Sequence, residues 1–568
     1  MVARPPRYFI NASCTIALCG MRMVCYFRSE ILTSMKKLLS VAEVLLIVLL
    51  AFFPLFGTFP YRINIFLSYE GAYRLSLGQV PYKDFGIPLG YMYWVVPGIF
   101  FKIFGPYMMS LVKAQVFLNI IAGLSFRSVL KSLQVKDGVR FLSVLLFVIS
   151  YSFFNYWPWY NHTVIVYELV ALSFVMKFIF GEGKKWRNVW LLLSGMFVFF
   201  SFFTKQDAGG MAFLICLALV LYNSINEKNW KQPLLFVAGF FVTGLLMIAP
   251  LLKYKIGYWF NHGQPPHISR ISFGDIAEDF FDNSPWIRFY IFIIVLLLLV
   301  RIKSFKEYWN NKPEMIFTLL TLGILAEAAV FQTTSYIPAD NNIFFHSFAF
   351  AFILALLTDY VPINFGSFKT MAFACIGMLL WWSNVYWKYM AKYIVKPEAP
   401  IVNTDGIVNK KTYLIQKPDT TDVPVDKWRT SNLKSFHKML LPGPTIDGID
   451  RLMSMDLVKN NQHLKVLNMT ELTPLAYEMK FELEANSDYP LWFHKGVGMF
   501  QQQTNMFCDR IKNNYYDLVM FEYIPYLNNF YPFQVRDSLL QYYERVDVFT
   551  APRKPSLQAW VEVYVKKK

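Results

Sequence analysis

The chain has 568 residues, of which 55% are hydrophobic and 16% charged, with a formal net charge of +17 at pH 7. Soluble globular proteins carry about 25% charged residues, so this composition argues against a cytosolic enzyme. The contents of Gly, Pro and Cys (28, 29 and 6 residues) exclude a collagen-like chain, a disordered chain and a disulfide scaffold. The sequence therefore predicts a polytopic α-helical membrane protein, whose 18% of aromatic residues suit lipid-facing helices.

The positive charge is concentrated before the last third of the chain. Residues 1–390 carry a net charge of +14 and residues 391–568 carry +3. This distribution favours anionic lipid headgroups and not nucleic acid, because no basic cluster lies on a soluble module. Residues 1–34 contain neither the apolar core of a signal peptide nor a metal-ligand spacing, and we expect a non-functional N-terminal extension there.

Twelve apolar stretches follow, and a membrane-spanning helix needs about 20 such residues. They cover residues 38–57, 88–105, 108–130, 139–157, 161–180, 187–203, 208–223, 232–252, 286–301, 313–331, 343–360 and 368–387. If all twelve crossed, the basic loops 131–140 and 184–187 would lie opposite Lys36 and Lys37, against the positive-inside rule. If 88–105 lies along the outer surface instead, the rule is obeyed. We therefore predict a membrane domain over 35–390 with about eleven crossings and a cytoplasmic N-terminus.

This orientation gathers the unusual polar residues near the membrane on its outer side. They are Glu70, Arg74, Lys83, Asp84, His162, Lys205, Asp207, Gln332, Asp340 and His346. Polar residues gathered in this way predict a catalytic or binding site at the outer surface of the membrane. Structural roles stay open beside it: a Glu70–Arg74 ion pair, a turn capped by Asp84, and a helix end at Lys205.

Several familiar motifs are missing from the sequence. It has no phosphate-binding GxxxxGK[ST] loop, no HExxH or paired CxxC metal motif, and no GxSxG elbow. We therefore expect no nucleotide cofactor and assign no metal site, and the sequence leaves a metal requirement open. Glu168 and Glu327 lie inside apolar stretches, where a carboxylate is costly and a functional or bundle-buried role is the default interpretation.

The first outer loop carries a family resemblance. Its motifs are EGAY at 70–73, GQVPYKDF at 78–85, a proline at 88 and FG at 104–105. Together they resemble the GT-C superfamily of membrane glycosyltransferases, and within it the protein O-mannosyltransferases, the aminoarabinose transferases and their bacterial relatives. Lys205-Gln206 also resembles a recurring outer turn of these relatives. The resemblance covers residues 36–390.

The resemblance implies transfer of a sugar from a polyprenyl-phosphate donor to a glycan, lipid or protein acceptor at the outer face. A carboxylate must then take the proton of the acceptor hydroxyl, and cations must stabilise the departing phosphate. We expect the base to be Asp84 or Glu70, with Asp84 ahead because its stretch matches better. Candidates for donor-phosphate or substrate binding are Arg74, Lys83, Lys205, Asp207 and His346. Many relatives have their catalytic Asp about where this chain has Asn64.

For residues 391–568 the sequence predicts an extracytoplasmic α/β domain. Short apolar runs at 464–468, 517–521, 546–550 and 560–565 are typical of strands, and 536–543 of a helix. Two other functions stay open, a transporter or flippase of lipid-linked saccharides and a non-catalytic envelope-assembly protein. No inverted repeat supports the transporter. The resemblance favours a multi-pass protein of the bacterial inner membrane.

Overall fold

A computed structural model describes most of the chain. The described residues are 37–61, 64–152, 155–181, 183–260, 272–335, 343–384, 386–387, 390, 423, 427–461, 463–525, 530, 532–553 and 558–567. The predicted extension 1–34 and the predicted start of the tail at 391 lie outside these residues.

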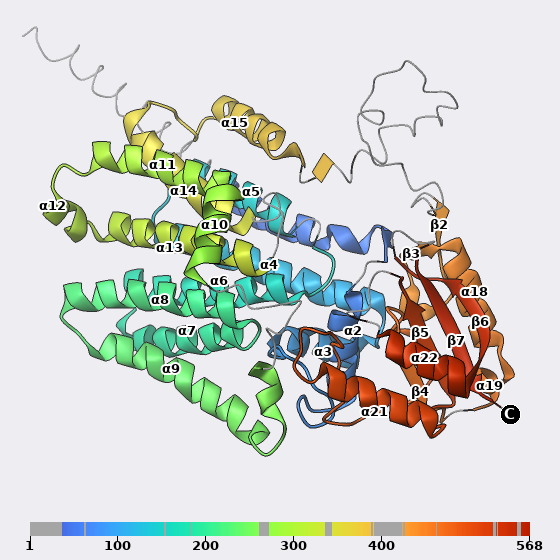
Figure 1. The fold of residues 1–568 in the computed structure, drawn as a ribbon. Coiled ribbons are helices and arrows are strands. Elements are labelled where there is room, and N and C mark those ends of the chain that lie inside the picture. Colours follow the sequence, from blue (N-terminus) through green and yellow to red (C-terminus); the bar gives the residue numbers. More distant parts are fainter. Residues whose placement is uncertain are drawn as a thin grey trace, which may run out of the picture.

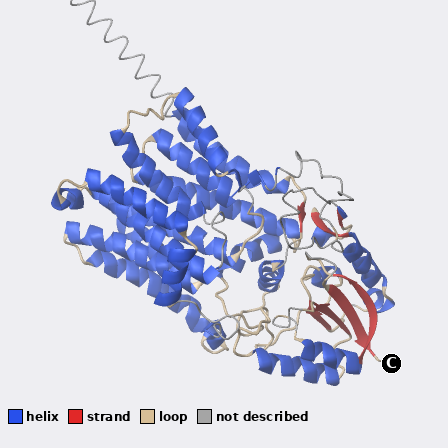
Figure 2. Cartoon of the chain, turned by 45° about the horizontal axis from the view of Figure 1, so that its top comes forward, coloured by secondary structure: helices blue, strands red, loops and turns tan. Residues whose placement is uncertain are grey.

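Most helices form one end of the molecule, and the strands lie at the other end together with a few helices (Figures 1 and 2). Figure 1 places α2 (Ile65–Ser76) and α3 (Met92–Phe104) between the two ends. The other long helices are Lys37–Leu55, α4 (Met108–Ser132), α5 (Asp137–Phe147), α6 (Tyr160–Phe180), α7 (Arg187–Phe202), α8 (Gln206–Glu227), α9 (Lys231–Ile248), α11 (Pro285–Arg301), α13 (Lys312–Ser335), α14 (Ile343–Tyr360) and α15 (Phe368–Trp381). Each of the twelve predicted apolar stretches overlaps one of these helices, although the stretch 139–157 continues past α5, which ends at Phe147.

Six of the described helices are long and apolar enough to cross a membrane. A seventh span results if α10 (Phe273–Asp282) and α11, which are bent by 81° at their junction, count as one. Helices α3, α7, α14 and α15 are apolar but shorter. Length and composition thus indicate an integral multi-pass membrane protein, while the predicted eleven crossings stay a prediction.

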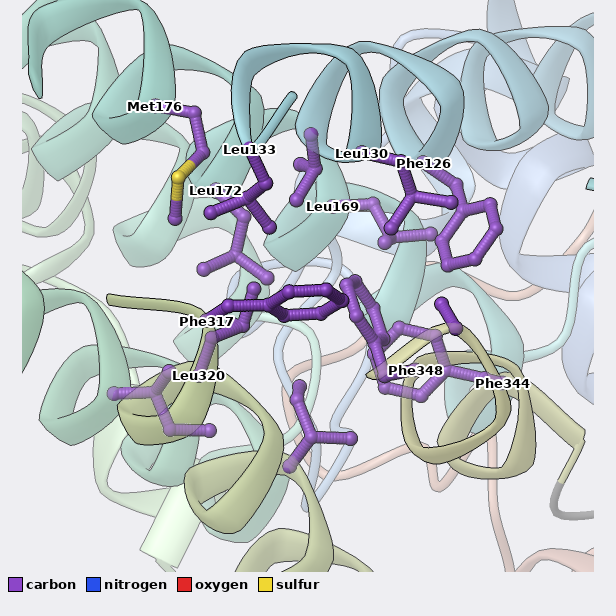
Figure 3. Packing of buried hydrophobic residues seen from close by; sticks show 14 of the residues in the cluster. Phe126, Leu130, Leu133, Leu169, Leu172, Met176, Phe317, Leu320, Phe344 and Phe348 are labelled. Atoms are coloured by element: carbon purple, nitrogen blue, oxygen red, sulfur yellow. The ribbon is translucent and has the colours of Figure 1, made fainter. Parts of the chain in front are cut away.

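The helical core is packed almost entirely by aliphatic and aromatic side chains. Figure 3 shows α4 and α6 contributing one layer and α13 and α14 the facing one. The labelled residues, all buried, are Phe126, Leu130, Leu133, Leu169, Leu172, Met176, Phe317, Leu320, Phe344 and Phe348. Because lipid is as apolar as these residues, the helices gain by close van der Waals packing and not by escaping water.

Glycines bring α7 and α9 into backbone contact. A Cβ atom on Gly195 would lie 2.3 Å from the carbonyl oxygen of Phe236, and one on Gly239 would lie 2.5 Å from that of Leu192. Backbone atoms cannot move aside as a flexible side chain can. The two small residues therefore fix how closely these helices approach.

We expect Gly195→Ala to lower the stability of the purified protein by about 1–3 kcal/mol, the usual cost of an inserted methyl group in a packed core. Gly210→Ala in α8 is the matched control, because a Cβ atom there meets nothing within 4 Å. Thermal unfolding in one detergent compares the two variants. Equal melting temperatures would show that α7 and α9 separate without cost.

Two small sheets lie at the other end. In the first, β1 (Phe59–Pro60) pairs in parallel with β3 (Met439–Pro442), which pairs antiparallel with β2 (Trp428–Thr430). The second has the order β4-β5-β7-β6, in which only the β4–β5 pair is parallel. Its strands are β4 (Val466–Met469), β5 (Leu518–Tyr523), β6 (Tyr543–Thr550) and β7 (Trp560–Lys566). The four predicted strands are confirmed, but the pairing of β1 with the C-terminal region was not foreseen.

Among the described residues, five α-helices accompany the strands of the C-terminal region. They are α18 (Gly443–Ser454), α19 (Asp456–Asn460), α20 (Leu475–Glu478), α21 (Phe500–Lys512) and α22 (Phe533–Tyr542), and α22 confirms the predicted helix. Helix α18 packs against β6, and α21 packs against α22. This C-terminal region is therefore a mixed α/β structure.

The first loop is bonded to the C-terminal region along an extended stretch. The Gly86 N–H donates to the Tyr489 carbonyl at 2.8 Å, and the Leu491 N–H donates to the Gly86 carbonyl at 3.0 Å. Beside them the Asn486 N–H donates to the Asp84 carbonyl at 2.7 Å. These bonds fix the loop that follows α2 against the C-terminal region.

Candidate functional site

Helix α2 begins at a position completed by a residue from the far end of the chain. Asn64, the N-cap, has a left-handed backbone with a φ of 67°, and its own side chain caps nothing. Instead a carboxylate oxygen of Glu471 accepts a hydrogen bond from the Asn64 N–H at 2.9 Å, and the Phe66 N–H bonds to the same carboxylate. Because a helix N-terminus leaves such N–H groups without partners, Glu471 satisfies α2 from outside.

A cavity of about 270 Å³ lies between the first half of α2, the end of β4 and the segment around Tyr489. Its polar wall residues are Asn64, Glu70, Asn468, Thr470, Glu471 and Arg553, and its aromatic ones are Phe66, Tyr489, Phe493, Phe507 and Phe530. Ligand pockets measure about 300–1,000 Å³ and combine apolar walls with a few convergent polar groups. The volume of this cavity lies slightly below that range, and its lining of convergent polar and aromatic side chains makes it the candidate site.

Glu70 faces this cavity and forms an ion pair on its helix. An Arg74 guanidinium nitrogen lies 2.8 Å from a Glu70 carboxylate oxygen. Arg74 also donates to the Gln79 side chain at 2.7 Å and to the Glu484 carbonyl at 2.8 Å, and its guanidinium lies 4.7 Å from the centre of the Tyr489 ring. The i,i+4 pair is thus present, and it positions a carboxylate at the cavity wall.

Asp84 and Lys83 lie in the turn after α2 and are not among the residues that line the cavity. A carboxylate oxygen of Asp84 accepts a hydrogen bond from the Val80 N–H at 2.7 Å, which closes the turn. The Lys83 ammonium lies 3.7 Å from the other Asp84 oxygen and is half exposed. Asp84 therefore caps this turn, which is the structural role that the sequence left open for it.

Lys205 and Asp207 pair with each other at the start of α8, away from the cavity wall. The Lys205 ammonium lies 2.8 Å from an Asp207 carboxylate oxygen, and both side chains are about nine-tenths buried. The ammonium also contacts the hydroxyl of Ser335 at the end of α13 and lies 4.5 Å from the centre of the Phe331 ring. The structure thus places these two predicted residues together, bonded across to α13.

His346 lies in α14 at a different, mostly apolar pocket of about 470 Å³. Its Nδ1 is 2.9 Å from the Tyr290 hydroxyl, and its ring packs 4.2 Å from that of Trp286. Among the predicted site residues, only Glu70 lines the candidate cavity, with Arg74 bonded behind it.

Sequence reasoning missed the charged cluster on the C-terminal wall. Arg553 donates to Glu522, and its second nitrogen lies 3.4 Å from a Glu471 carboxylate oxygen. The Glu471 N–H donates to Glu522 at 2.9 Å. All three side chains are buried. Burial and the negative charge of Glu522 raise the pKa of Glu471 to about 8, against the opposing effect of Arg553.

One signal for this cluster was present in the sequence. Glu471 follows the end of β4 by two residues and Glu522 is the penultimate residue of β5, and these two strands are parallel neighbours. Ligands of open α/β sheets bind outside the carboxyl ends of such strands. Among the described residues, no group of three or more His, Cys, Asp or Glu side chains has the arrangement of a metal site.

Comparison with known proteins gives a fold but no sequence relative. No protein-family model matches the chain, and no curated protein matches it. The crystal structure of ArnT from Cupriavidus metallidurans in the apo state is similar, with a TM-score of 0.50 and 11% identity, over 92% of this chain and 97% of that one. The structure of that ArnT bound to undecaprenyl phosphate gives a TM-score of 0.45 and 12% identity over the same shares. The GT-C resemblance is thereby confirmed at the level of the fold.

Proposed function

We propose that this chain, which shares the fold of the GT-C aminoarabinose transferase ArnT, is a membrane glycosyltransferase. It moves a sugar from a polyprenyl-phosphate-linked donor to a glycan, lipid or protein acceptor. The observation that carries the proposal is the cavity in which Glu70 meets the polar wall of the C-terminal region. The binding of undecaprenyl phosphate by ArnT is in line with the proposed donor class.

The proposed chemistry needs a base at the cavity wall. The acceptor hydroxyl attacks the anomeric carbon, gives up its proton, and displaces the lipid phosphate. Glu70 fits the base better than Asp84, because Glu70 lines the cavity while Asp84 holds the Val80 N–H. Arg74 supports this role, since its ion pair holds the Glu70 carboxylate at the cavity wall.

The departing phosphate needs positive charge or hydrogen-bond donors close to it. Arg553 is the cation among the residues that line the cavity. Lys205, which is bonded to Asp207 and Ser335, does not line this cavity, and His346 lies at the apolar pocket. We therefore place the phosphate at the C-terminal wall, with Lys205, Asp207 and His346 contributing to packing or to the lipid part of the donor.

The membrane orientation is part of the proposal. Thirteen basic residues in the short loops of one side, against four in the outer loops after the first one, support about eleven crossings with the N-terminus inside. The C-terminal region and the cavity then lie at the outer face of a bacterial inner membrane. No metal is assigned a role in this chemistry.

Sugar transfer by the purified full-length chain tests the proposal. The protein in lipid nanodiscs receives a labelled pool of polyprenyl-phosphate-linked sugars and an envelope extract as acceptor. We expect labelled sugar on an acceptor and free polyprenyl phosphate in equal amounts. In proteoliposomes, movement of intact lipid-linked sugar across the bilayer without release of polyprenyl phosphate would contradict the enzyme and favour the transporter.

A further inference from the structure

The C-terminal wall of the cavity offers a second carboxyl group with a role of its own. We propose that Glu471 acts as a neutral carboxylic acid that donates a hydrogen bond to the departing phosphate, and that this residue belongs to the catalytic machinery. The inference rests on the proposed function, because it assigns the phosphate end of the same site. It adds a residue that the sequence motifs of the first loop do not contain.

The geometry places Glu471 between a helix end and an arginine. Its carboxylate accepts the Asn64 N–H at 2.9 Å and bonds to the Phe66 N–H, both at the start of α2. Its other oxygen lies 3.4 Å from Arg553. The side chain is 2% exposed to solvent yet lines the cavity. A ligand in the cavity therefore meets Glu471, Arg553 and the N-terminus of α2 together.

The charges around Glu471 favour a bound proton. Two buried carboxyl groups, Glu471 and Glu522, face one guanidinium, that of Arg553, so ionisation of both acids leaves an excess negative charge in a buried place. Glu70, ion-paired to Arg74, stands on the α2 side of the same cavity. Burial and Glu522 raise the pKa of Glu471 to about 8, against the lowering effect of Arg553 and of the Asn64 and Phe66 N–H groups, and this favours the protonated form.

A neutral acid suits the departing phosphate, because this group gains negative charge during the reaction. When the bond between the anomeric carbon and the phosphate oxygen breaks, the electron pair stays on the phosphate, which changes from a singly charged diester to a doubly charged monoester. A protonated Glu471 donates to the new charge while its proton stays on the carboxyl group. An ionised Glu471 would repel the same charge. The two cavity carboxyls then have different roles set by their surroundings, Glu70 as base and Glu471 as donor.

A purely structural role is the competing explanation. Glu471 caps α2, and losing that cap would disturb the cavity regardless of any proton. Glu471→Gln separates the two roles. The amide oxygen accepts from the Asn64 N–H as the carboxylate does, while the amide nitrogen provides a donor that does not titrate near pH 8.

Binding of undecaprenyl phosphate by the full-length chain in nanodiscs, measured from pH 7 to pH 9.5, is the experiment. A phosphate monoester is largely doubly charged above pH 7, since its second pKa is about 6, so changes in this range come from the protein. We expect wild-type affinity to fall as the pH rises through about 8. Glu471→Gln should bind with no such fall. Glu471→Met, which lacks the donor, should bind about 10- to 100-fold more weakly at pH 7.

A neighbouring variant gives a second readout. Glu522→Gln removes the negative charge that raises the pKa of Glu471, and Glu522 does not line the cavity. The fall in affinity should therefore move to lower pH, which no capping role predicts. If the affinity for undecaprenyl phosphate falls at alkaline pH in Glu471→Gln and Glu522→Gln as it does in the wild type, this inference is overturned and the proposed function stands. Absence of undecaprenyl phosphate binding by the wild type at every pH overturns the proposed function itself.

Discussion

Glu70→Gln is expected to lower sugar transfer by about 10²- to 10⁴-fold, the usual contribution of a general base. The amide keeps the size of the side chain at the cavity wall but cannot accept the acceptor proton. Asp84→Asn should retain most of the activity, because an Asn oxygen still accepts the Val80 N–H that closes the turn. Initial rates with a labelled lipid-linked sugar compare both variants with the wild type.

The loss of the Glu70 charge also leaves Arg74 without its ion-pair partner, and a control must separate the two effects. Gln79→Met removes a different partner of the Arg74 guanidinium and keeps the Glu70 carboxylate. We expect this variant to share any structural weakening and to keep its transfer activity. If Asp84→Asn abolished transfer while Glu70→Gln did not, the base would be the residue that the first-loop motif favours, and our reassignment would be wrong.

Glu43→Ala is expected to have the largest effect on folding. Glu43 is fully buried between helices and accepts from the Arg127 Nε at 2.6 Å and from the Arg140 Nε at 2.9 Å. Its removal leaves Arg127 without a carboxylate partner and leaves Arg140 paired only with Asp137, 2.7 Å away. Breaking a buried pair in this way costs about 3–5 kcal/mol. We expect a strongly lowered melting temperature and little extractable protein.

The partly exposed cluster of Glu227, Arg187 and Lys312 provides the comparison, because its side chains are about 30% exposed. Glu227→Gln should cost less than about 1 kcal/mol, as for most exposed ion pairs. Thermal unfolding in detergent, followed by size-exclusion chromatography, measures both variants. Similar melting temperatures for the two would mean that water reaches Arg127 and Arg140 and that burial does not set their energy.

Long apolar helices were the part of this fold that the sequence predicted best. A stretch such as 108–130 or 161–180 needs only its own residues to form backbone hydrogen bonds, so α4 and α6 could be read locally. The number of crossings is different, because it depends on how far α3 or α15 tilts against its neighbours. Those neighbours are remote in sequence, and length alone does not reveal them.

The candidate site was only half predictable for the same reason. Glu70 and Arg74 stand in one helix at a spacing that pairs them. Glu471 reaches Asn64 across 407 residues, and no local pattern announces such a contact. The motif match favours Asp84 as the base, but a turn of five residues is enough to occupy its carboxylate. A residue can therefore lie in the expected motif while its side chain is already used in a structural hydrogen bond.

The parallel pairing of β1 with β3 has a consequence for the order of synthesis and folding. β1 precedes most of the membrane helices, and its partner strand belongs to the last third of the chain. At 5–20 residues per second, the ribosome needs roughly 20–80 s to make the 407 residues that separate the two walls of the cavity. The membrane helices can insert during this time, while the first loop waits with an unpaired strand edge. If the cavity is the active site, as proposed, a chain truncated before residue 439 would lack one of its two walls, and we expect it to have no transfer activity.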